Sequence, residues 1–234
     1  PPGRCVTRGL RLMQPVRKAT VLISGTGSNL QALIDAIDRN ALDLEIIHVI
    51  SNVADAAGLQ RAADAGLRSS VLEHGRFENR ADFDAALALL MAAGDPDLVV
   101  LAGFMRIIGD AVLTPFRGRM INLHPALLPK YRGVDTYQRA LDAGDDIHGA
   151  SIHFVTAELD GGPVISQIEI PILTGDTAET LAARLGPKEH KLLVATVEFF
   201  TRHAVECVNG TITVDGSTLE SPLQLQNDGS LRAP

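Results

Sequence analysis

Apolar residues along the chain alternate between short continuous runs and longer segments with helical spacing. Short runs rich in Val, Ile and Leu predict buried strands at residues 19–24, 44–51, 69–72, 97–102 and 120–123. Apolar residues that recur every three or four positions predict helices at residues 31–39, 56–65, 82–93 and 111–116. Strands that alternate with helices are typical of a doubly wound, mostly parallel α/β sheet with helices on both faces. We therefore predict a single α/β domain over residues 19–215.

The pattern changes in the second half of the chain. Residues 149–156 alternate between polar and apolar side chains, which predicts a strand with Ser151 and His153 facing outward. Residues 164–170 form a second apolar run after a turn signal. Together the two runs predict an antiparallel pair at the edge of the sheet.

The C-terminal part contains a long helical pattern and a hairpin signal. Helical spacing extends over residues 177–203, and the pattern leaves open whether Gly186-Pro187 interrupts this helix. Asn209-Gly210 stands between two β-branched runs, which is a strong signal for a hairpin. Residues 216–234 show no comparable pattern, and we predict that they form a flexible tail.

The first residues fit neither a strand nor a helix, and we predict that residues 1–18 form a disordered N-terminal extension. Although this segment is rich in Arg and lacks acidic residues, it does not have the Ser content or the amphipathic period of a transit peptide. Met13 precedes the first strand closely, and we expect it to be the natural start, with residues 1–12 a start-site artefact.

Charge and cysteine content exclude several classes of protein. The chain has 21 Lys and Arg against 28 Asp and Glu, for a net charge of −7. Five of the basic residues lie within residues 1–18, so the folded part is more acidic still, which argues against a nucleic-acid partner. No apolar run reaches the length of a membrane helix, so we expect no membrane partner. Cys5 and Cys207 lack metal-ligand spacing and are typical of a reducing compartment, so we expect a cytoplasmic protein.

A glycine-rich turn after the first strand predicts a binding site for an anion. Residues 25–29, Gly-Thr-Gly-Ser-Asn, join this strand to a helix, so free N–H groups and the positive end of the helix meet there. The dinucleotide fingerprint G-x-G-x-x-G fails at Leu30, and the second strand ends in Ser51-Asn52 without an acid for a ribose. This favours a monophosphate site over an NAD site, while a simple tight turn remains the plain alternative.

Asn122 and His124 are candidates for catalysis. They are two residues apart on a predicted strand, so both side chains project to the same face near the strand's carboxyl end, where ligands usually bind. An amide donor beside an imidazole suits a carbonyl oxygen that becomes an oxyanion. Alternatively, both groups cap loop backbone.

The apolar loop at residues 103–108 either walls a pocket for a flat ligand or packs as core beneath a helix.

Four segments, taken in order, resemble the phosphoribosylglycinamide formyltransferases, folate-dependent enzymes of purine synthesis. They are Ser-Gly-Thr-Gly-Ser-Asn-Leu at 24–30, Gly-Phe-Met-Arg-Ile at 103–107, Asn-x-His-Pro-x-Leu-Leu-Pro at 122–129 and Leu-Asp-Gly-Gly-Pro at 159–163. The match is colinear from about residue 19 to residue 214. The resemblance implies a Rossmann-like formyltransferase fold and the transfer of a formyl group from 10-formyltetrahydrofolate to the amine of 5'-phosphoribosylglycinamide, without a metal.

The resemblance also assigns residues to the site. It implies that the catalytic residues are Asn122, His124 and Asp160, with Asp160 raising the pKa of His124. It implies that the ribotide is bound by Gly27, Ser28, Asn29 and Glu189. It implies that the folate is bound by Arg80, Met105, Arg106, Ile107, Ile108, Asn122, Thr156, Ala157, Glu158, Leu159 and Asp160. The chain departs from the common pattern at Ala126, Asp135, Ala157 and Gly186, which puts individual substrate contacts in question.

Two related activities share the implied catalytic residues. A methionyl-tRNA formyltransferase needs a tRNA-binding extension and a positive surface, neither of which we expect here. A formyltetrahydrofolate deformylase typically carries a regulatory domain before the catalytic one, and this activity is kept as the alternative. The histidines outside the catalytic set are expected to have surface or structural roles, namely His48, His74, His148, His153, His190 and His203. The sequence leaves open whether the protein is a monomer or a homodimer.

Overall fold

The computed structural model describes residues 17–234. The predicted N-terminal extension therefore lies outside the described residues, apart from Arg17 and Lys18, and Lys18 already begins the first strand. No helix in the described part of the chain is both long and apolar enough to cross a membrane.

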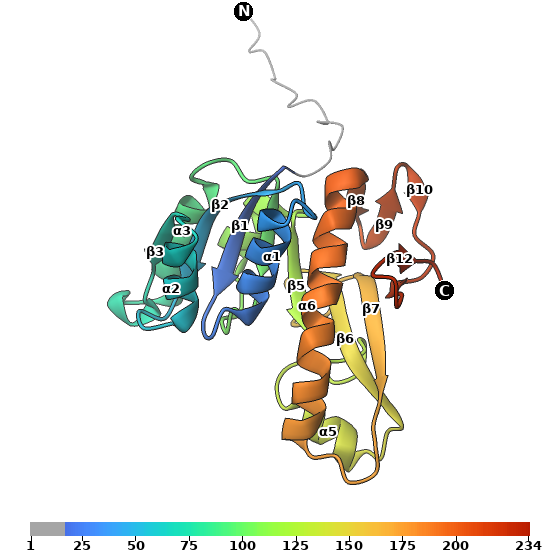
Figure 1. The fold of residues 1–234 in the computed structure, drawn as a ribbon. Coiled ribbons are helices and arrows are strands. Elements are labelled where there is room, and N and C mark those ends of the chain that lie inside the picture. Colours follow the sequence, from blue (N-terminus) through green and yellow to red (C-terminus); the bar gives the residue numbers. More distant parts are fainter. Residues whose placement is uncertain (1–16) are drawn as a thin grey trace, which may run out of the picture.

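A sheet of nine strands forms the centre of the molecule (Figure 1). Its order from edge to edge is β12-β11-β7-β6-β5-β4-β1-β2-β3. The strands are β1 Lys18–Ile23, β2 Glu45–Ser51, β3 Ser69–Val71, β4 Leu98–Leu101, β5 Met120–His124, β6 Ile147–Phe154, β7 Val164–Pro171, β11 Leu223–Leu225 and β12 Leu231–Arg232. The five strands from β3 to β5 are parallel, while β6 is antiparallel to both β5 and β7. The predicted doubly wound sheet and its antiparallel pair are confirmed.

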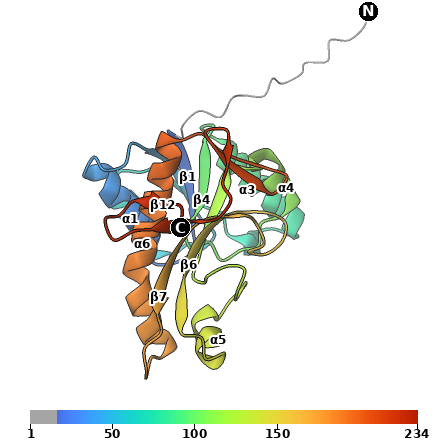
Figure 2. The same cartoon turned by 90° about the vertical axis from the view of Figure 1, so that its right-hand side faces the viewer.

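Helices cover both faces of this sheet (Figure 2). The helices are α1 Ser28–Asp38, α2 Ala57–Asp64, α3 Arg80–Ala92, α4 Asp110–Leu113, α5 Thr136–Asp142 and α6 Ala178–Arg202, with short 3-10 turns η1 His74–Arg76 and η2 Thr114–Phe116. Successive residues of β1 belong to different apolar clusters: Val21 and Ile23 pack with α1 and α6, and Leu22 packs with α3 and α4. Because both faces are buried, these strands appear in the sequence as continuous apolar runs.

Helix α6 is continuous over 25 residues, so Gly186-Pro187 does not interrupt it. A proline inside a helix removes one backbone hydrogen bond and costs about 3 kcal/mol. Thr177 caps the helix, and its apolar face buries residues on both sides of the proline, including Leu185 and Leu192. The burial of this face offsets the cost of Pro187, whose own side chain is exposed.

The C-terminal hairpin is confirmed, but the flexible tail is not. Strands β8 Val205–Val208, β9 Thr211–Val214 and β10 Ser217–Thr218 form a small antiparallel sheet, and Asn209 and Gly210 have positive φ angles of 51° and 83°. Beyond it, β11 pairs in parallel with β7, and β12 pairs with β11. The prediction of a flexible tail is therefore wrong for these strands. Each of them is two or three residues long, too short to leave a hydrophobic period.

The outward orientation predicted for Ser151 and His153 on β6 is also wrong. Both side chains are buried, because the chain after β5 folds back over this face of the sheet. The Ser151 hydroxyl donates to the Ala126 carbonyl at 2.7 Å and accepts from the Leu128 N–H at 3.0 Å. Polar alternation in β6 therefore indicates a buried hydrogen-bonding face.

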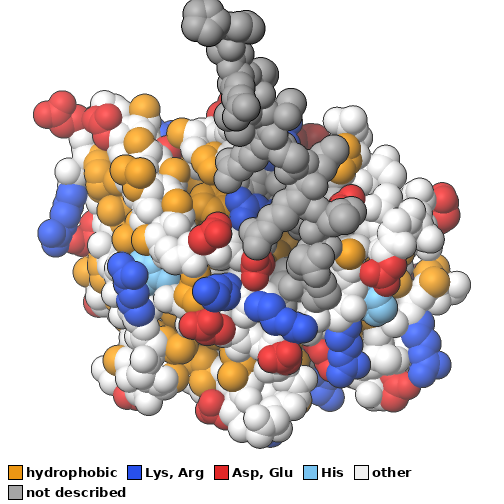
Figure 3. Space-filling model, turned by 90° about the horizontal axis from the view of Figure 1, so that it is seen from above, with side chains coloured by type: hydrophobic (Ala, Val, Ile, Leu, Met, Phe, Trp, Pro, Cys, Tyr) orange, Lys and Arg blue, Asp and Glu red, His pale blue; other side chains and the backbone are white. Residues whose placement is uncertain are grey.

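Surface charges of both signs are interspersed on the face shown in Figure 3. Ion pairs at the surface of the described residues include Arg17–Asp43 at 2.9 Å and, within α6, Arg202–Glu198 at 2.6 Å. Exposed pairs of this kind contribute little to stability, about 1 kcal/mol at most. The fold therefore depends on the two apolar layers that flank the sheet.

We expect the free energy of unfolding to decrease as the pH falls below neutral. Burial lowers the pKa of four histidines below the ordinary value of 6.5: His48, His124, His148 and His190. A group with a depressed folded-state pKa contributes stability above its unfolded pKa, and this stability is lost as the pH falls through the folded pKa. The loss should therefore begin near pH 6.5.

Urea unfolding at several pH values between about 7.5 and 5 measures this loss. Glu189 acts in the opposite sense, since burial raises its pKa, but it is one group against four. The variant His48→Gln should flatten the dependence, whereas the same change at exposed His74 should not. A free energy of unfolding that stays constant or rises on acidification would contradict the lowered pKa values of these histidines.

Candidate active site

Three loops that follow adjacent parallel strands meet at one edge of the sheet. They come after β1, β4 and β5, which are neighbours in the sheet, and this is the edge where ligands bind in open α/β folds. Ser24, just after β1, contacts residues that follow β2 and β4: its hydroxyl donates to the Asn52 side chain and accepts from the Met105 N–H at 2.7 Å. The ends of β1, β2 and β4 are thus linked by one side chain.

The structure brings the three predicted catalytic residues together. Asn122 and His124 lie on β5, and Asp160 lies in the connection between β6 and β7. The two carboxylate oxygens of Asp160 lie 3.5 Å from Asn122 Nδ2 and 3.4 Å from His124 Nδ1. The N–H of Gly133 donates to the same carboxylate at 2.9 Å. Asp160 is therefore the contact point between β5, the loop after it and the β6–β7 connection.

His124 is buried and has acceptors on both ring nitrogens. Its Nε2 lies 2.9 Å from the Tyr131 carbonyl, and its Nδ1 faces Asp160. Burial lowers the pKa of His124 below its ordinary value, and the Tyr131 carbonyl and the Asp160 charge only partly oppose this. Asp160 raises the pKa of His124, as predicted, but the loss of hydration is larger, so the net pKa is lowered.

The ionisation of Asp160 itself is favoured. Burial raises the pKa of its carboxyl, but the neighbouring His153 and His124 rings and the Gly133 N–H lower it more. The net pKa is below the ordinary value of 3.8. Asp160 therefore carries a negative charge at neutral pH and can stabilise a proton on His124 during a reaction.

The sequence analysis missed His153 as part of this site. Its Nδ1 lies 2.9 Å from the Phe154 carbonyl, which can only accept, so Nδ1 carries the proton and Nε2 is free to accept. Asn122 Nδ2 lies 3.1 Å from that Nε2, which fixes the orientation of the amide. His153 stands directly opposite Asn122 in the antiparallel β5–β6 register. The sequence alone shows a polar residue at His153 in a predicted strand. Only the strand register shows that this residue lies beside Asn122.

Most of the predicted folate residues line one cavity, of about 90 Å³. Its lining includes Asn122 and the residues implied for folate binding at 106–108 and 156–160. His124 does not line it, and two of the implied folate residues lie outside it as well. Met105 borders the glycine-rich loop instead, and Arg80 donates to the Ile107 carbonyl at 3.0 Å from behind the cavity wall.

The loop at 103–108 combines both readings that the sequence left open. Phe104 and Ile108 are buried in the apolar cluster under α3 and α4, as core packing requires. Met105 and Ile107 are exposed by 76% and 57%, and Ile107 lines the cavity of the folate residues. Alternate residues of one loop therefore anchor it to the core and form a pocket wall.

The glycine-rich loop after β1 has the geometry of an anion site. Gly27 precedes α1 with a positive φ of 69°, and the first turn of α1, which begins at Ser28, carries no acidic residue. N–H groups of a first helical turn have no partner within the helix. A cavity of about 180 Å³ is lined by residues 24–29 together with Ala102, Gly103 and Met105. Among the described residues, the buried Oδ1 of Asn29 has no hydrogen-bond partner.

Glu189 lies apart from the other residues implied for the ribotide. It lines neither of the two cavities described above, and its Oε1 accepts from the Tyr137 hydroxyl at 3.0 Å. Burial raises the pKa of Glu189, and burial together with the Glu189 charge raises the pKa of Tyr137. No group of three or more metal-ligating side chains occurs within residues 17–234.

Comparisons with known proteins agree with this site. Residues 17–197 match the formyl transferase family. The chain is 44% identical over 199 residues to the phosphoribosylglycinamide formyltransferase of Escherichia coli, covering 85% of this chain and 94% of the relative. The chain belongs to the phosphoribosylglycinamide formyltransferases. The formyltransferase of this name from Haemophilus influenzae is 39% identical, covering 87% of this chain and 96% of its own.

Solved structures give the same result for the fold. The phosphoribosylglycinamide formyltransferase of Coxiella burnetii, solved in complex with CHES, superposes with a TM-score of 0.83 at 45% identity, covering 87% of this chain and 96% of that one. The chain is thus a formyltransferase with the fold of that enzyme family. The alternative of a deformylase is not favoured, since these relatives are named as formyltransferases.

We expect His124→Ala and Asp160→Asn to keep the fold and to lose most of the turnover. Each change removes one side of the buried imidazole–carboxylate pair, and the loss of one preorganised group of this kind costs on the order of 10²-fold or more in rate. Steady-state kinetics, with circular dichroism to confirm folding, measure the effect. Asp215→Asn is the matched control, because Asp215 pairs with His203 at an exposed position outside the site. Near-normal rates in either site variant would refute the catalytic assignment.

Proposed function

We propose that this formyltransferase moves the formyl group of 10-formyltetrahydrofolate to the amine of 5'-phosphoribosylglycinamide, giving formylglycinamide ribotide and tetrahydrofolate. The observation that carries the proposal is a pair of neighbouring cavities, one lined by the glycine-rich loop and the other by Asn122 and Asp160. Residues 103 and 105 line the cavity of the glycine-rich loop, and residues 106–108 line the cavity that contains Asn122 and Asp160. One loop thus separates a site for a phosphate from a site for a folate.

In this proposal the ribotide phosphate binds at Gly27, Ser28 and Asn29. The free N–H groups of the first turn of α1 and its dipole favour a negative charge there. The folate occupies the cavity lined by residues 106–108 and 156–160. The amine of the ribotide then meets the formyl carbon next to Asn122 and Asp160.

Asn122 stabilises the oxyanion that forms when the amine attacks the formyl carbon. One of its amide N–H groups is held by His153 at 3.1 Å, while the contact of the same nitrogen with Asp160 is at the 3.5 Å limit of a hydrogen bond. The second N–H is therefore weakly engaged and can turn to a carbonyl oxygen at little cost. Such a donor contributes most when negative charge develops on that oxygen.

His124 and Asp160 transfer a proton from the attacking amine to N10 of the folate. The attacking amine must lose a proton, and N10 of the folate must gain one before the C–N10 bond breaks. A His124 imidazole that is neutral at the start can accept the proton of the amine through Asp160 or water. The resulting imidazolium is held by the Tyr131 carbonyl on Nε2 and by the Asp160 carboxylate on Nδ1. The imidazolium then returns the proton to N10. The proton that the amine loses is thus the one that N10 gains, and this transfer needs no metal.

In this proposal, folate binding widens the cavity by movement of residues 156–159, while Asp160 keeps its contacts. The cavity of about 90 Å³ is far smaller than the roughly 300 to 1,000 Å³ that drug-sized ligands occupy. Glu158 in this segment pairs with Arg132, and the side chains of both are at least one-third exposed. An exposed pair of this kind costs little to break. We therefore assign the opening to this segment rather than to the buried strands beneath it.

A formyl-transfer assay with and without the ribotide tests the proposed function. Purified protein is mixed with 10-formyltetrahydrofolate, and the change in folate absorbance is followed. We expect a signal that requires 5'-phosphoribosylglycinamide and that glycinamide without the phosphoribosyl group does not restore. An equally fast signal without the ribotide would identify water as the acceptor and replace this function with that of a deformylase.

A further inference from the structure

Helix α2 packs directly against the glycine-rich loop. The N–H of Gly58 donates to the Gly25 carbonyl at 3.0 Å. The two backbones are so close that a Cβ added to Gly27 would lie 2.5 Å from the Cα of Gly58. A side chain at Gly58 would likewise meet Ile23 at 2.6 Å, so α2 and the loop form one rigid unit.

Arg61, one turn further along α2, bridges this loop to α1. Its Nε donates to the Thr26 carbonyl at 2.8 Å, and its Nη1 donates to Gln31 Oε1 at 3.2 Å. The planar guanidinium fixes both contacts at once, which a single ammonium group cannot do. Within residues 17–234, Arg61 forms no ion pair with an acidic side chain, so its charge is not neutralised by a direct partner.

The contact with Thr26 determines where the next N–H points. In a planar trans peptide, the C=O of one residue and the N–H of the following residue point in opposite directions. With the Thr26 carbonyl held by Arg61, the Gly27 N–H is directed away from Arg61. Arg61 does not line the cavity of about 180 Å³ in front of the loop, so it braces the loop from behind that cavity.

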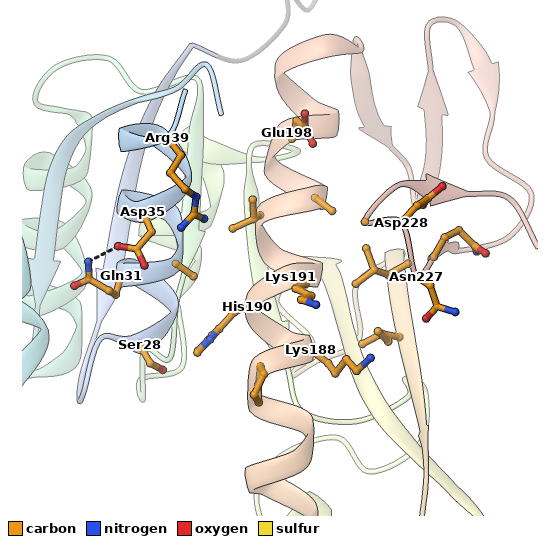
Figure 4. Close-up of a pocket in the computed structure, with 18 of the residues that line it drawn as sticks. Ser28, Gln31, Asp35, Arg39, Lys188, His190, Lys191, Glu198, Asn227 and Asp228 are labelled. Atoms are coloured by element: carbon orange, nitrogen blue, oxygen red, sulfur yellow. Dashed lines mark hydrogen bonds between the residues drawn. The ribbon is translucent and has the colours of Figure 1, made fainter. Parts of the chain in front are cut away.

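Arg61 instead borders a different, larger cavity, which begins at Ser28. This groove of about 730 Å³ runs along the exposed face of α6 to the turn at 226–229. Figure 4 shows Gln31 and Asp35 on the α1 side of the groove, joined by a hydrogen bond of 2.8 Å. Gln31 is neutral, so neither of the two groups that Arg61 contacts compensates its positive charge.

We propose that Arg61 is a positioning residue for the ribotide phosphate. It holds the Thr26–Gly27 peptide so that the N–H groups at the start of α1 face the anion, and it places a positive charge beside the loop. This inference rests on the proposed function, in which Gly27, Ser28 and Asn29 bind the phosphate. Arg61 acts through the loop and takes no part in the transfer of the formyl group.

Kinetics of Arg61→Ala test the proposal. We expect KM for the ribotide to rise about tenfold or more, because two charge-assisted hydrogen bonds are lost. The KM for the folate and kcat at saturating ribotide should stay within about twofold, since Asn122, His124 and Asp160 are untouched. The inhibition constant of inorganic phosphate should rise with KM for the ribotide. Added guanidinium ion at tens of millimolar should restore part of the loss, which a merely structural defect would not allow.

Two further variants separate this role from a general effect of charge or folding. Arg39→Ala removes an arginine that lines the same groove without a side-chain hydrogen bond to the described residues, and it should leave KM for the ribotide unchanged. Gln31→Met removes the partner of Arg61 Nη1 while keeping the charge, and it should raise KM by a smaller factor than Arg61→Ala. If Arg61→Ala does not fold, Arg61→Lys replaces it, with an intermediate rise expected.

Three results distinguish failure of this inference from failure of the proposed function. A KM for the ribotide within about twofold of wild type in a folded Arg61 variant would overturn the positioning role. Equal losses in Arg61→Ala and Arg39→Ala would also overturn it, because they would indicate only a field effect. Absence of ribotide-dependent transfer in the wild-type protein would instead refute the proposed function.

Discussion

The carboxylate of Asp160 is the interaction on which the site depends. It lies in the connection between β6 and β7, which leaves β6 beside the start of β5 and folds back over the strand to reach Asn122 and His124. There it contacts Asn122 and His124 and accepts the Gly133 N–H. A change in this connection would leave the parallel half of the sheet intact but would separate the two halves of the site. The antiparallel edge is therefore part of the catalytic geometry.

Local patterns in the sequence predicted the sheet and the pair on β5. Buried parallel strands leave continuous apolar runs because both of their faces are covered, and β1, β2 and β4 are of this kind. Asn122 and His124 could be placed together because residues two apart on a strand share a face. The involvement of Asp160 could not be obtained this way. It came from the resemblance, since no local pattern shows that a turn will fold back onto a distant strand.

Features that depend on long-range packing were missed or predicted wrongly. His153 joins the site through strand register, which the separation of 31 positions between Asn122 and His153 conceals in the sequence. Pro187 left the continuity of α6 open, and the apolar face of that helix outweighs a single lost hydrogen bond. The strands β11 and β12 are too short to show a period, and they exist because β7 offers an edge. In each case tertiary contacts override a local preference.

Burial and charge act in opposite directions on His124, and the balance suits a residue that must carry a proton only briefly. Burial favours the neutral imidazole, whereas the Tyr131 carbonyl and Asp160 favour the imidazolium. If burial acted alone, the ring could not accept a proton from the amine; if the acceptors dominated, it would already be charged before the substrate bound. Because the two effects oppose each other, a small change on substrate binding, such as the exclusion of water near Asp160, can shift the proton. A weakly basic, well-partnered histidine is thus the form of this side chain that can both accept a proton and release it.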